Sequence, residues 1–216
     1  MADPVTGEPP GEAPRPASGP ESGPESTPAS PVGRLLLVGT GSLGVASLPF
    51  WLNWLRLQHP DVDTKVVLTR TAERFVSRVT LSPILGKQVL QDAWPQEPET
   101  TALHVDLAQW AEGVVVYPAS FHFIARLALG LADTPVLLAL HCTRAPIVLA
   151  PALPPGGAES PAYLRHLDAL AKRPNIAVLP PQAGYSVTTG RMDASTAAPL
   201  PEALAALAAL GRPAAG

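Results

Sequence analysis

The apolar and polar positions of this chain alternate between two kinds of segment. Runs that are apolar almost throughout, each of strand length, are separated by longer stretches whose apolar residues recur every few positions. The first pattern is typical of strands buried on both faces, and the second of amphipathic helices. Strands and helices that alternate along a chain build a parallel sheet that is covered by helices on both sides.

The individual elements follow from the same pattern. We predict strands in residues 34–39, 65–69, 113–117, 134–142, 145–152 and 175–181. We predict helices in residues 45–58, 71–79, 121–132, 162–173 and 201–211, with Pro49 near the start of the first. The expected fold class is therefore α/β, a single three-layer domain that is Rossmann-like (flavodoxin-like) and has an open parallel sheet.

The first 32 residues differ in composition from the rest of the chain. Nine prolines, four glycines and no aromatic residue fall within residues 1–32. Such a segment cannot bury enough apolar surface to offset the entropy lost on ordering, so we predict a disordered tail or linker. Residues 33–216 then form the predicted folded domain.

The composition of the 216-residue chain argues against several classes of protein. A net charge of −3 without a basic cluster disfavours nucleic acid or an anionic membrane as partner. Cys142 is the only cysteine, so we expect no disulfide framework and no thiolate metal site, and we expect its side chain to be buried. No histidine spacing suits a metal centre. Neither a membrane span nor a secretory signal is recognisable, so a cytoplasmic protein is expected.

Candidate binding residues lie where the predicted strands end, which is where open α/β sheets bind ligands. After the first strand, Gly39, Gly41 and Gly44 permit close backbone approach, and Ser42 with the following amides can hold an anion. No acidic residue follows the strand at 65–69 to bind the ribose of a dinucleotide. That strand ends in Thr-Arg-Thr, whose hydroxyls suit a mononucleotide. A purely structural turn is the alternative.

Three further side chains have both a structural and a functional interpretation. Ser120 stands directly before a predicted helix, so its hydroxyl can cap that helix or contact a phosphate or ribityl group. His122 follows it and can line a pocket. His104 lies between a proline-rich loop and a new helix, and its surroundings in the sequence favour a structural role as long as nothing else is considered.

In this order and spacing, the motifs resemble those of the homo-oligomeric flavin-containing cysteine decarboxylases. That family includes the peptidyl-cysteine decarboxylases of epidermin-type lantibiotic pathways and the phosphopantothenoylcysteine decarboxylases of coenzyme A synthesis. Its motif Pro-Ala-Ser-Ala-Asn-Thr resembles residues 118–123, Pro-Ala-Ser-Phe-His-Phe, and its essential histidine precedes the proline by fourteen positions, as His104 does. Gly130 and Asp133 continue the resemblance, which covers about residues 33–195.

The resemblance implies that His104 is catalytic, since an imidazole can take or relay a proton near neutral pH. It implies FMN as the cofactor, because a flavin can accept a hydride as cysteine is oxidised. It also implies a homo-oligomer, a trimer or a dodecamer stacked from trimers, with FMN between subunits. The residues implied to bind FMN are Gly39, Thr40, Gly41, Ser42, Val45, Thr69, Thr71, Phe75, Pro118, Ala119, Ser120 and His122.

Three departures from the family pattern bear on the site. The family clamp Pro-x-Met-Asn-x-x-Met-Trp grips the cysteine carboxylate with its asparagine, and this chain has Pro154 at that position. His122 replaces the asparagine of the flavin motif. The substrate flap resembles residues 187–192, but the cysteine that coenzyme A enzymes place in this region is absent. The residues expected to bind substrate are Leu153, Pro154, Gly190, Arg191 and Met192.

We therefore expect an enzyme that oxidatively decarboxylates the C-terminal cysteine of a ribosomally made precursor peptide to an enethiol, as in lanthipeptide synthesis. The absent flap cysteine favours this branch, because the coenzyme A enzymes use that thiol to reduce their intermediate. One alternative is a phosphopantothenoylcysteine decarboxylase. The alternative from a different class is a catalytically silent FMN-binding regulatory homologue. A flavin prenyltransferase shares the fold but lacks a histidine at the position of His104.

Overall fold

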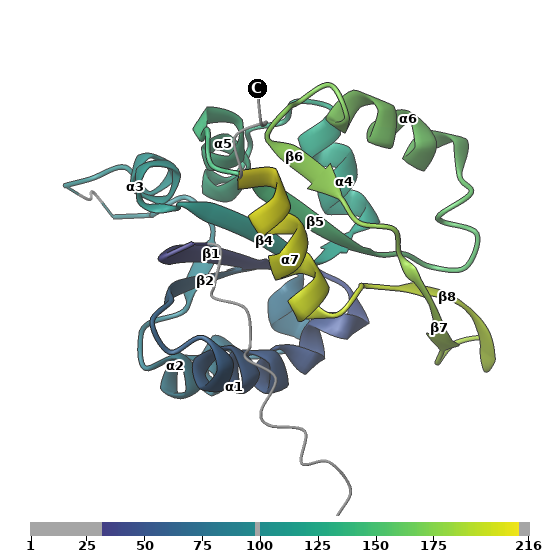
Figure 1. Ribbon diagram of the computed structural model, residues 1–216, viewed down its shortest axis with the longest axis horizontal. Helices are drawn as coiled ribbons and strands as arrows, with labels where there is room; N and C mark the ends of the chain where they lie inside the picture. Colours follow the sequence, from purple (N-terminus) through teal and green to yellow (C-terminus); the bar gives the residue numbers. More distant parts are fainter. Residues whose placement is uncertain (1–31, 98–99, 212–216) are drawn as a thin grey trace, which may run out of the picture.

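The computed structural model describes residues 32–97 and 100–211. The tail predicted for residues 1–32 lies outside the described residues except for Val32, as do the last five residues of the predicted domain. Within the described part, six strands form one parallel sheet in the order β3-β2-β1-β4-β5-β6 (Figure 1). This is the strand order of the Rossmann fold, so the predicted α/β class is confirmed.

The strands of the sheet are β1 (Arg34–Gly39), β2 (Asp63–Thr69), β3 (Leu90–Asp92), β4 (Gly113–Ser120), β5 (Ile147–Ala152) and β6 (Ile176–Val178). The helices are α1 (Leu48–Gln58), α2 (Arg78–Leu85), α3 (Leu103–Trp110), α4 (Phe121–Ala128), α5 (Pro135–Cys142), α6 (Pro161–Leu170) and α7 (Leu200–Gly211), with short 3-10 helices at Leu43–Ser47 and Ala72–Arg74. An antiparallel hairpin consists of β7 (Gln182–Ser186) and β8 (Arg191–Thr196).

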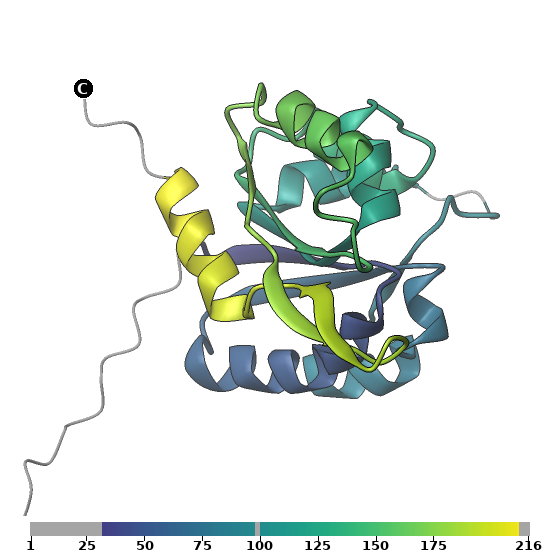
Figure 2. The same ribbon diagram turned by 90° about the vertical axis from the view of Figure 1, so that its right-hand side faces the viewer.

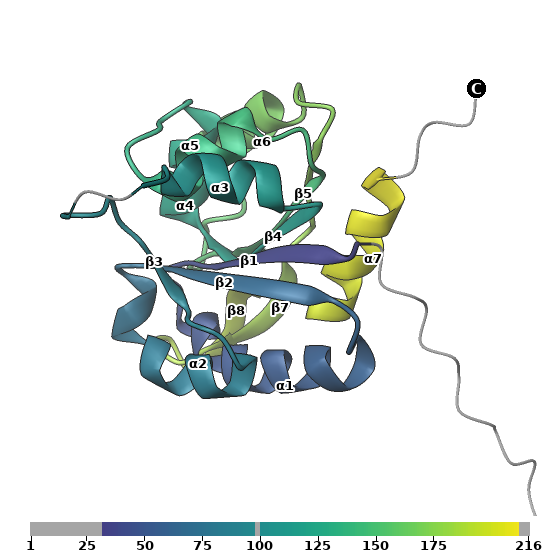
Figure 3. The ribbon, with the colours of Figure 1, turned by 90° about the vertical axis from the view of Figure 1, so that its left-hand side faces the viewer.

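Helices cover both faces of the sheet, as Figure 2 and Figure 3 show. Successive side chains of a strand point to opposite faces, so β1 contributes to two separate cores. Leu36 and Val38 pack with α3, α4, α5 and α6, whereas Leu35 and Leu37 pack with α1, α2 and α7. One core lies on each face of the sheet. The sheet and the helices on its two faces are the three layers that the apolar runs predict.

One predicted strand is wrong. Residues 134–142 form helix α5, which carries Pro135 in its first turn directly after Thr134 at the N-cap. Proline is well placed at a helix start, and the leucines and alanine that follow favour helix. Because α5 is buried along most of its length, its apolar run has no polar face to show a helical period. Cys142, expected to be buried, is exposed at the end of this helix.

The apolar pattern also missed β3 and the β7–β8 hairpin. Strand β3 has only three residues, and β7 mixes glycine, serine and exposed side chains, so neither forms an apolar run. The hairpin stands apart from the main sheet and is joined to it by a bridge between Leu153 and Ser195 (Figure 2). A search of the described residues found no helix long and apolar enough to cross a membrane.

Candidate active site

The site lies where the order of the sheet reverses direction. Strands β1 and β4 are neighbours, but the chain leaves β1 toward α1 on one face and leaves β4 toward α4 on the other. The two loops diverge at the carboxyl ends of these strands and leave a crevice between them. Open α/β sheets bind their ligands in such a crevice.

Thr40 connects the two loops through its hydroxyl group. Its Oγ1 donates a hydrogen bond to the carbonyl oxygen of Pro118 at 2.6 Å and accepts one from the amide of Ser120 at 2.8 Å. The Thr40 side chain is 1% exposed, so water does not compete for these bonds. The position of Ser120 therefore depends on a buried threonine at the end of β1.

Ser120 begins helix α4, as predicted from the sequence. Its Oγ accepts a hydrogen bond from the amide of Phe123 at 3.3 Å, which satisfies one of the free amides of the first turn. Ser120 also lines the two cavities described below. The same residue therefore caps α4 and lies at the candidate site.

We expect Ser120→Ala to lower the free energy of unfolding by about 1 kcal/mol, because the N-cap bond to Phe123 is lost. Urea unfolding followed by circular dichroism measures this change. Ser77→Ala is the matched control, since Ser77 caps α2 in the same way but lies in neither cavity. Both variants are expected to lose stability, and Ser120→Ala alone to lose affinity for a cofactor. Unchanged cofactor affinity in Ser120→Ala would mean that Ser120 is a cap and nothing more.

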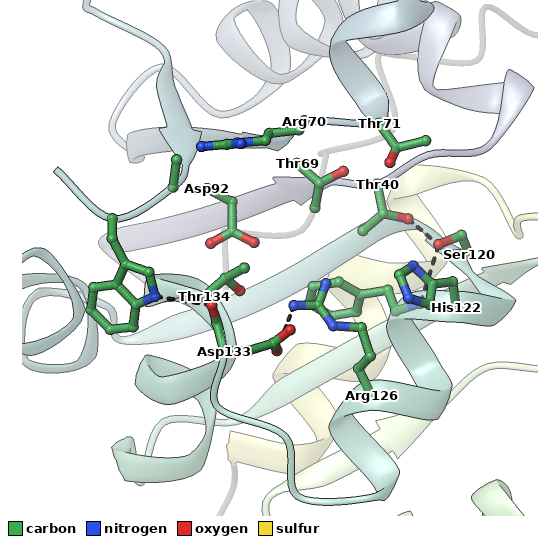
Figure 4. A pocket seen from close by; sticks show the side chains of 13 residues that line it. Thr40, Thr69, Arg70, Thr71, Asp92, Ser120, His122, Arg126, Asp133 and Thr134 are labelled. Atoms are coloured by element: carbon green, nitrogen blue, oxygen red, sulfur yellow. Dashed lines mark hydrogen bonds and ion pairs between the residues drawn. The ribbon is translucent and has the colours of Figure 1, made fainter. Parts of the chain in front are cut away.

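The first cavity, here the polar cavity, has a volume of about 370 Å³ at the carboxyl ends of β1, β2, β3 and β4 (Figure 4). Its walls contain hydroxyl groups, two arginines and two aspartates. Arg126 forms an ion pair with Asp133 at 2.5 Å. The lining residues are Thr40, Thr69, Arg70, Thr71, Asp92, Ala93, Trp94, Ser120, His122, Phe123, Arg126, Asp133 and Thr134.

Asp92 is the buried acid of the polar cavity, with 3% of its surface exposed. One carboxylate oxygen accepts the amide hydrogen of Val136 at 3.0 Å, in the first turn of α5. Burial raises the pKa of the carboxyl group, although the hydrogen bond from Val136, the nearby Thr134 hydroxyl and the positive charge of Arg126 oppose the shift. Asp92 therefore carries its negative charge at a cost that the fold only partly offsets.

We expect Asp92→Asn to gain stability relative to the wild type as the pH rises from 4 to 8. A raised pKa in the folded state makes the carboxyl group stabilising while protonated, and this stability is lost as the pH rises through the folded-state pKa. Asparagine keeps an acceptor for Val136 but does not titrate. Urea unfolding of both proteins across this pH range measures the difference, with the exposed Asp168→Asn as control. A difference that stays constant with pH would contradict the assignment.

The second cavity, here the hairpin cavity, has a volume of about 640 Å³ and lies between the β1 and β5 loops and the β7–β8 hairpin. No aspartate, glutamate, lysine or arginine lines it, and its walls are aliphatic, aromatic and hydroxyl groups. Ser120 and His122 line both cavities, so the two meet there. The remaining lining residues are Gly41, Ser42, Leu43, Gly44, Phe121, Ala152, Leu153, Pro154, Pro155, Tyr185, Ser186, Val187, Thr188, Thr189, Ala194, Ser195, Thr196 and Ala197.

The structure brings together most of the residues predicted to bind the cofactor. The polar cavity takes in Thr40, Thr69, Thr71, Ser120 and His122, and the hairpin cavity takes in Gly41 and Ser42. The predicted residues that line neither cavity are Gly39, Val45, Phe75, Pro118 and Ala119. Of these, Phe75 is 43% exposed, and the other four are buried in or beside the core.

Gly41 has a packing reason to be glycine. A Cβ atom there would lie 2.4 Å from Cγ2 of Thr71, because the loops after β1 and β2 run against each other. Any larger residue would push Thr71 away from the polar cavity. The glycine-rich loop thus holds the threonines of the predicted site close together.

The predicted substrate residues divide into two groups. Leu153 and Pro154 line the hairpin cavity, together with residues 187–189 of the flap. Gly190, Arg191 and Met192 are exposed and line neither cavity. Gly190 has a φ of 68°, which turns the chain from β7 into β8 and is a conformation that favours glycine.

His104 lies in neither cavity. It is in the first turn of α3, where its ring packs edge-on against Trp94 with centroids 5.6 Å apart. Its Nδ1 is buried and has no hydrogen-bond partner within the described part of the chain. Trp94 lines the polar cavity and donates its Nε1 hydrogen to the carbonyl oxygen of Asp133 at 2.9 Å. Trp94 therefore separates His104 from the polar cavity of the same chain.

The sequence-based set missed the charged and aromatic part of the polar cavity, including Asp92, Trp94 and Asp133. Arg126 lies four positions after His122 on α4, so helical spacing could have placed both on one face. Asp92 ends a strand too short to predict, and no signal in the sequence marked it.

Known proteins resemble this chain in sequence. The sequence profile of the Flavoprotein family matches residues 25–202. The cypemycin cysteine dehydrogenase (decarboxylating) of a Streptomyces species is 31% identical over 77% of this chain and 86% of its own length. The bifunctional protein of coenzyme A biosynthesis from Haemophilus influenzae is 32% identical over 71% of this chain, which spans 38% of that longer protein.

Solved structures show the same fold. The cypemycin decarboxylase superimposes with a TM-score of 0.71 at 28% identity, over 86% of this chain and 97% of that one. An FMN-dependent cysteine decarboxylase from thioviridamide biosynthesis superimposes with a TM-score of 0.65 at 27% identity, over 82% and 97% of the two chains. With its family profile, its relatives and its fold in agreement, the chain belongs to the flavoprotein family that contains the flavin-dependent cysteine decarboxylases.

Proposed function

We propose that this protein is an FMN-dependent enzyme that oxidatively decarboxylates the C-terminal cysteine of a ribosomally made precursor peptide. The product is an enethiol, a precursor of aminovinyl-cysteine rings in peptide natural products. The observation that carries the proposal is the meeting of two cavities at Ser120 and His122. One is polar and lies at the switch point of the sheet, and the other is uncharged and opens beneath a hairpin.

The residues of the polar cavity fit an FMN molecule. Its volume of about 370 Å³ falls within the range of small-molecule sites. Thr40, Thr69, Thr71 and Ser120 offer hydroxyls to a ribityl chain and a phosphate, and the buried Thr134 Oγ1 has no hydrogen-bond partner among the described residues. We assign the FMN phosphate to the loop after β1, where Gly41 and Ser42 line the adjoining hairpin cavity directly before the 3-10 helix Leu43–Ser47.

Once bound, FMN supplies the acceptor for the hydride that leaves the cysteine side chain. The chain itself positions the peptide and moves protons. The hairpin cavity excludes water from the last residues of the peptide with Leu153, Phe121 and Val187. We assign proton transfer to the His104 imidazole, and its unpartnered Nδ1 supports this role. Loss of the carboxyl group as CO2 then leaves the enethiol.

We further propose that the site is completed by other copies of the chain, in a trimer or in a dodecamer stacked from trimers. His104 is shielded from the polar cavity of its own chain by Trp94, so it would act on a site that an adjacent copy helps to form. Trp94, Val105, Leu129 and Leu131 expose between 39% and 67% of their surface near this end of α3 and α4. Native mass spectrometry measures the assembly, and a monomer would contradict the proposal.

The hairpin cavity favours a peptide over phosphopantothenoylcysteine as substrate. The phosphate of phosphopantothenoylcysteine would be a second phosphate beside that of FMN, and this cavity has no lysine or arginine in its walls to bind it. Cys142 is the only cysteine of the chain and lies at the end of α5, outside both cavities. No thiol is therefore available in the site to reduce the enethiol. A reducing cytoplasm, where Cys142 stays a free thiol, is the compartment we propose.

Release of CO2 from two candidate substrates tests whether the protein acts as a peptide-modifying decarboxylase or as a coenzyme A decarboxylase. We expect the FMN-loaded protein to release CO2 from peptides of uncharged residues that end in cysteine, and at least tenfold more slowly from phosphopantothenoylcysteine. The same peptide ending in serine is the negative control. Preference for phosphopantothenoylcysteine would move the protein to the coenzyme A branch. Bound FMN with no CO2 from either substrate would favour a silent flavoprotein.

A further inference from the structure

We infer that His122 binds the C-terminal carboxylate of the substrate, in the role that the clamp asparagine has in the resembled family. The inference rests on the proposed function, because it concerns the grip on the same peptide. It starts from position 154, where this chain lacks the asparagine that binds the substrate carboxylate in the resembled family. Pro154 has no side-chain donor, so the carboxylate of the last residue needs another partner.

Among the clamp residues Leu153, Pro154 and Pro155, which line the hairpin cavity, no backbone amide is free to replace that donor. Pro154 and Pro155 have no amide hydrogen. The amide of Leu153 already donates to the carbonyl oxygen of Ser195 at 2.8 Å, and that of Gly157 donates to the carbonyl oxygen of Pro154 at 2.8 Å. The loop therefore closes one side of the hairpin cavity with apolar surface and leaves the carboxylate unbound there.

His122 is the one side chain in the wall of the hairpin cavity that contains nitrogen. The other polar groups in that wall are hydroxyls and backbone atoms. A carboxylate moved out of water needs a hydrogen-bond donor, and the ring N–H of His122 can donate to it. The cavity walls contain no acidic side chain that would compete for it.

The position of His122 suits the reacting residue of the peptide. The C-terminal cysteine must present its side chain to the flavin while the preceding residues lie away from it. It therefore lies where the polar and hairpin cavities meet, and His122 lines both of them at that point. His122 is in the first turn of α4, and carboxylates are favoured near helix N-termini.

The charged residues around His122 leave its imidazole available to bind the substrate carboxylate. Asp133 interacts electrostatically with His122, but it already forms an ion pair with Arg126. Arg126 and Arg70 line only the polar cavity, on the side that we assign to the flavin. Within the described part of the chain, the exposed His122 imidazole forms no side-chain hydrogen bond.

Isothermal titration calorimetry on the FMN-loaded protein tests the inference. The probe is an acetylated pentapeptide of alanine, valine and leucine that ends in serine, prepared as the free acid and as the C-terminal amide. Serine replaces the reactive thiol by a hydroxyl, so binding is measured without turnover. We expect the wild type to bind the acid about tenfold or more tightly than the amide, as a charge-assisted hydrogen bond predicts.

In His122→Ala we expect the two forms to bind equally, with the amide affinity changed by less than about twofold. His122→Gln keeps a neutral donor and is expected to retain about a threefold preference, which also covers a failure of His122→Ala to hold FMN. His59→Ala, which removes a histidine at the end of α1 outside both cavities, is the control. An undiminished acid preference in either His122 variant, or none in the wild type, overturns the inference.

Failure of the proposed function is a separate result. If the wild type releases no CO2 from cysteine-ended peptides, the proposed function fails whatever the calorimetry shows. If it releases CO2 and His122→Ala still prefers the free acid, the enzyme stands and only the assignment of His122 is wrong. The calorimetric ratio therefore reports on His122 independently of turnover.

Discussion

Replacing His104 by alanine is expected to lower the rate of peptide decarboxylation by about 10² to 10⁴-fold, the usual contribution of a general acid or base. The position on α3, the unpartnered Nδ1 and the spacing to Pro118 together select this imidazole. Because His104 is not among the residues that we assign to FMN, the visible spectrum of bound FMN is expected to stay unchanged. Rates of CO2 release and visible spectra of the same samples measure both effects.

The control for this prediction is His59→Ala, which removes an imidazole from the far end of α1. It is expected to keep both the rate and the flavin. A second variant, Trp94→Phe, keeps an aromatic ring against His104 and is expected to lose less than tenfold in rate. If His104→Ala decarboxylates as fast as the wild type, the proton must be moved by another group, and the carry-over of the family histidine to His104 is wrong.

Replacing Thr40 by valine is expected to lower the free energy of unfolding by about 2–6 kcal/mol and to abolish FMN binding. Valine has nearly the shape of threonine, but it leaves the carbonyl of Pro118 and the amide of Ser120 without their buried partner. Each buried group left unsatisfied costs about 1–3 kcal/mol. Urea unfolding and titration of the apoprotein with FMN measure the two losses.

Thr40→Ser is the matched control, because it removes a methyl group and keeps the hydroxyl. We expect it to cost about 1 kcal/mol and to retain FMN. If Thr40→Val unfolds at the same urea concentration as Thr40→Ser, the hydroxyl does not connect the two loops in solution. That outcome would also remove the physical reason for placing the cofactor at this switch point.

The sequence predicted the parts of the fold in which packing is uniform. The apolar runs that became β1, β4 and β5 are buried on both faces, so every residue in them carries the same signal. The run at 134–142 carries that signal too, but α5 is a helix surrounded by other helices and the sheet. An apolar run shows that a segment is buried, and its length and first residues must decide between strand and helix.

Sequence analysis could place those site residues whose role depends on their neighbours in the chain. Ser120 stands before a helix, and Gly41 stands in a turn, so their positions followed from the residues next to them. Asp92, Trp94 and Asp133 come from a short strand and two loops, and only the folded chain brings them to one cavity. The placement of Trp94 in front of His104 is of the same kind.

The most direct test of the proposed enzyme is one experiment on the purified full chain. Its visible spectrum is recorded, and it is then incubated with a peptide of uncharged residues that ends in cysteine. We expect a yellow protein and a product lighter by about 46 Da, the mass of one CO2 and two hydrogens, with the mass unchanged in His104→Ala. A colourless protein that cannot be loaded with FMN, or a loaded protein that leaves every such peptide unchanged, would contradict the account.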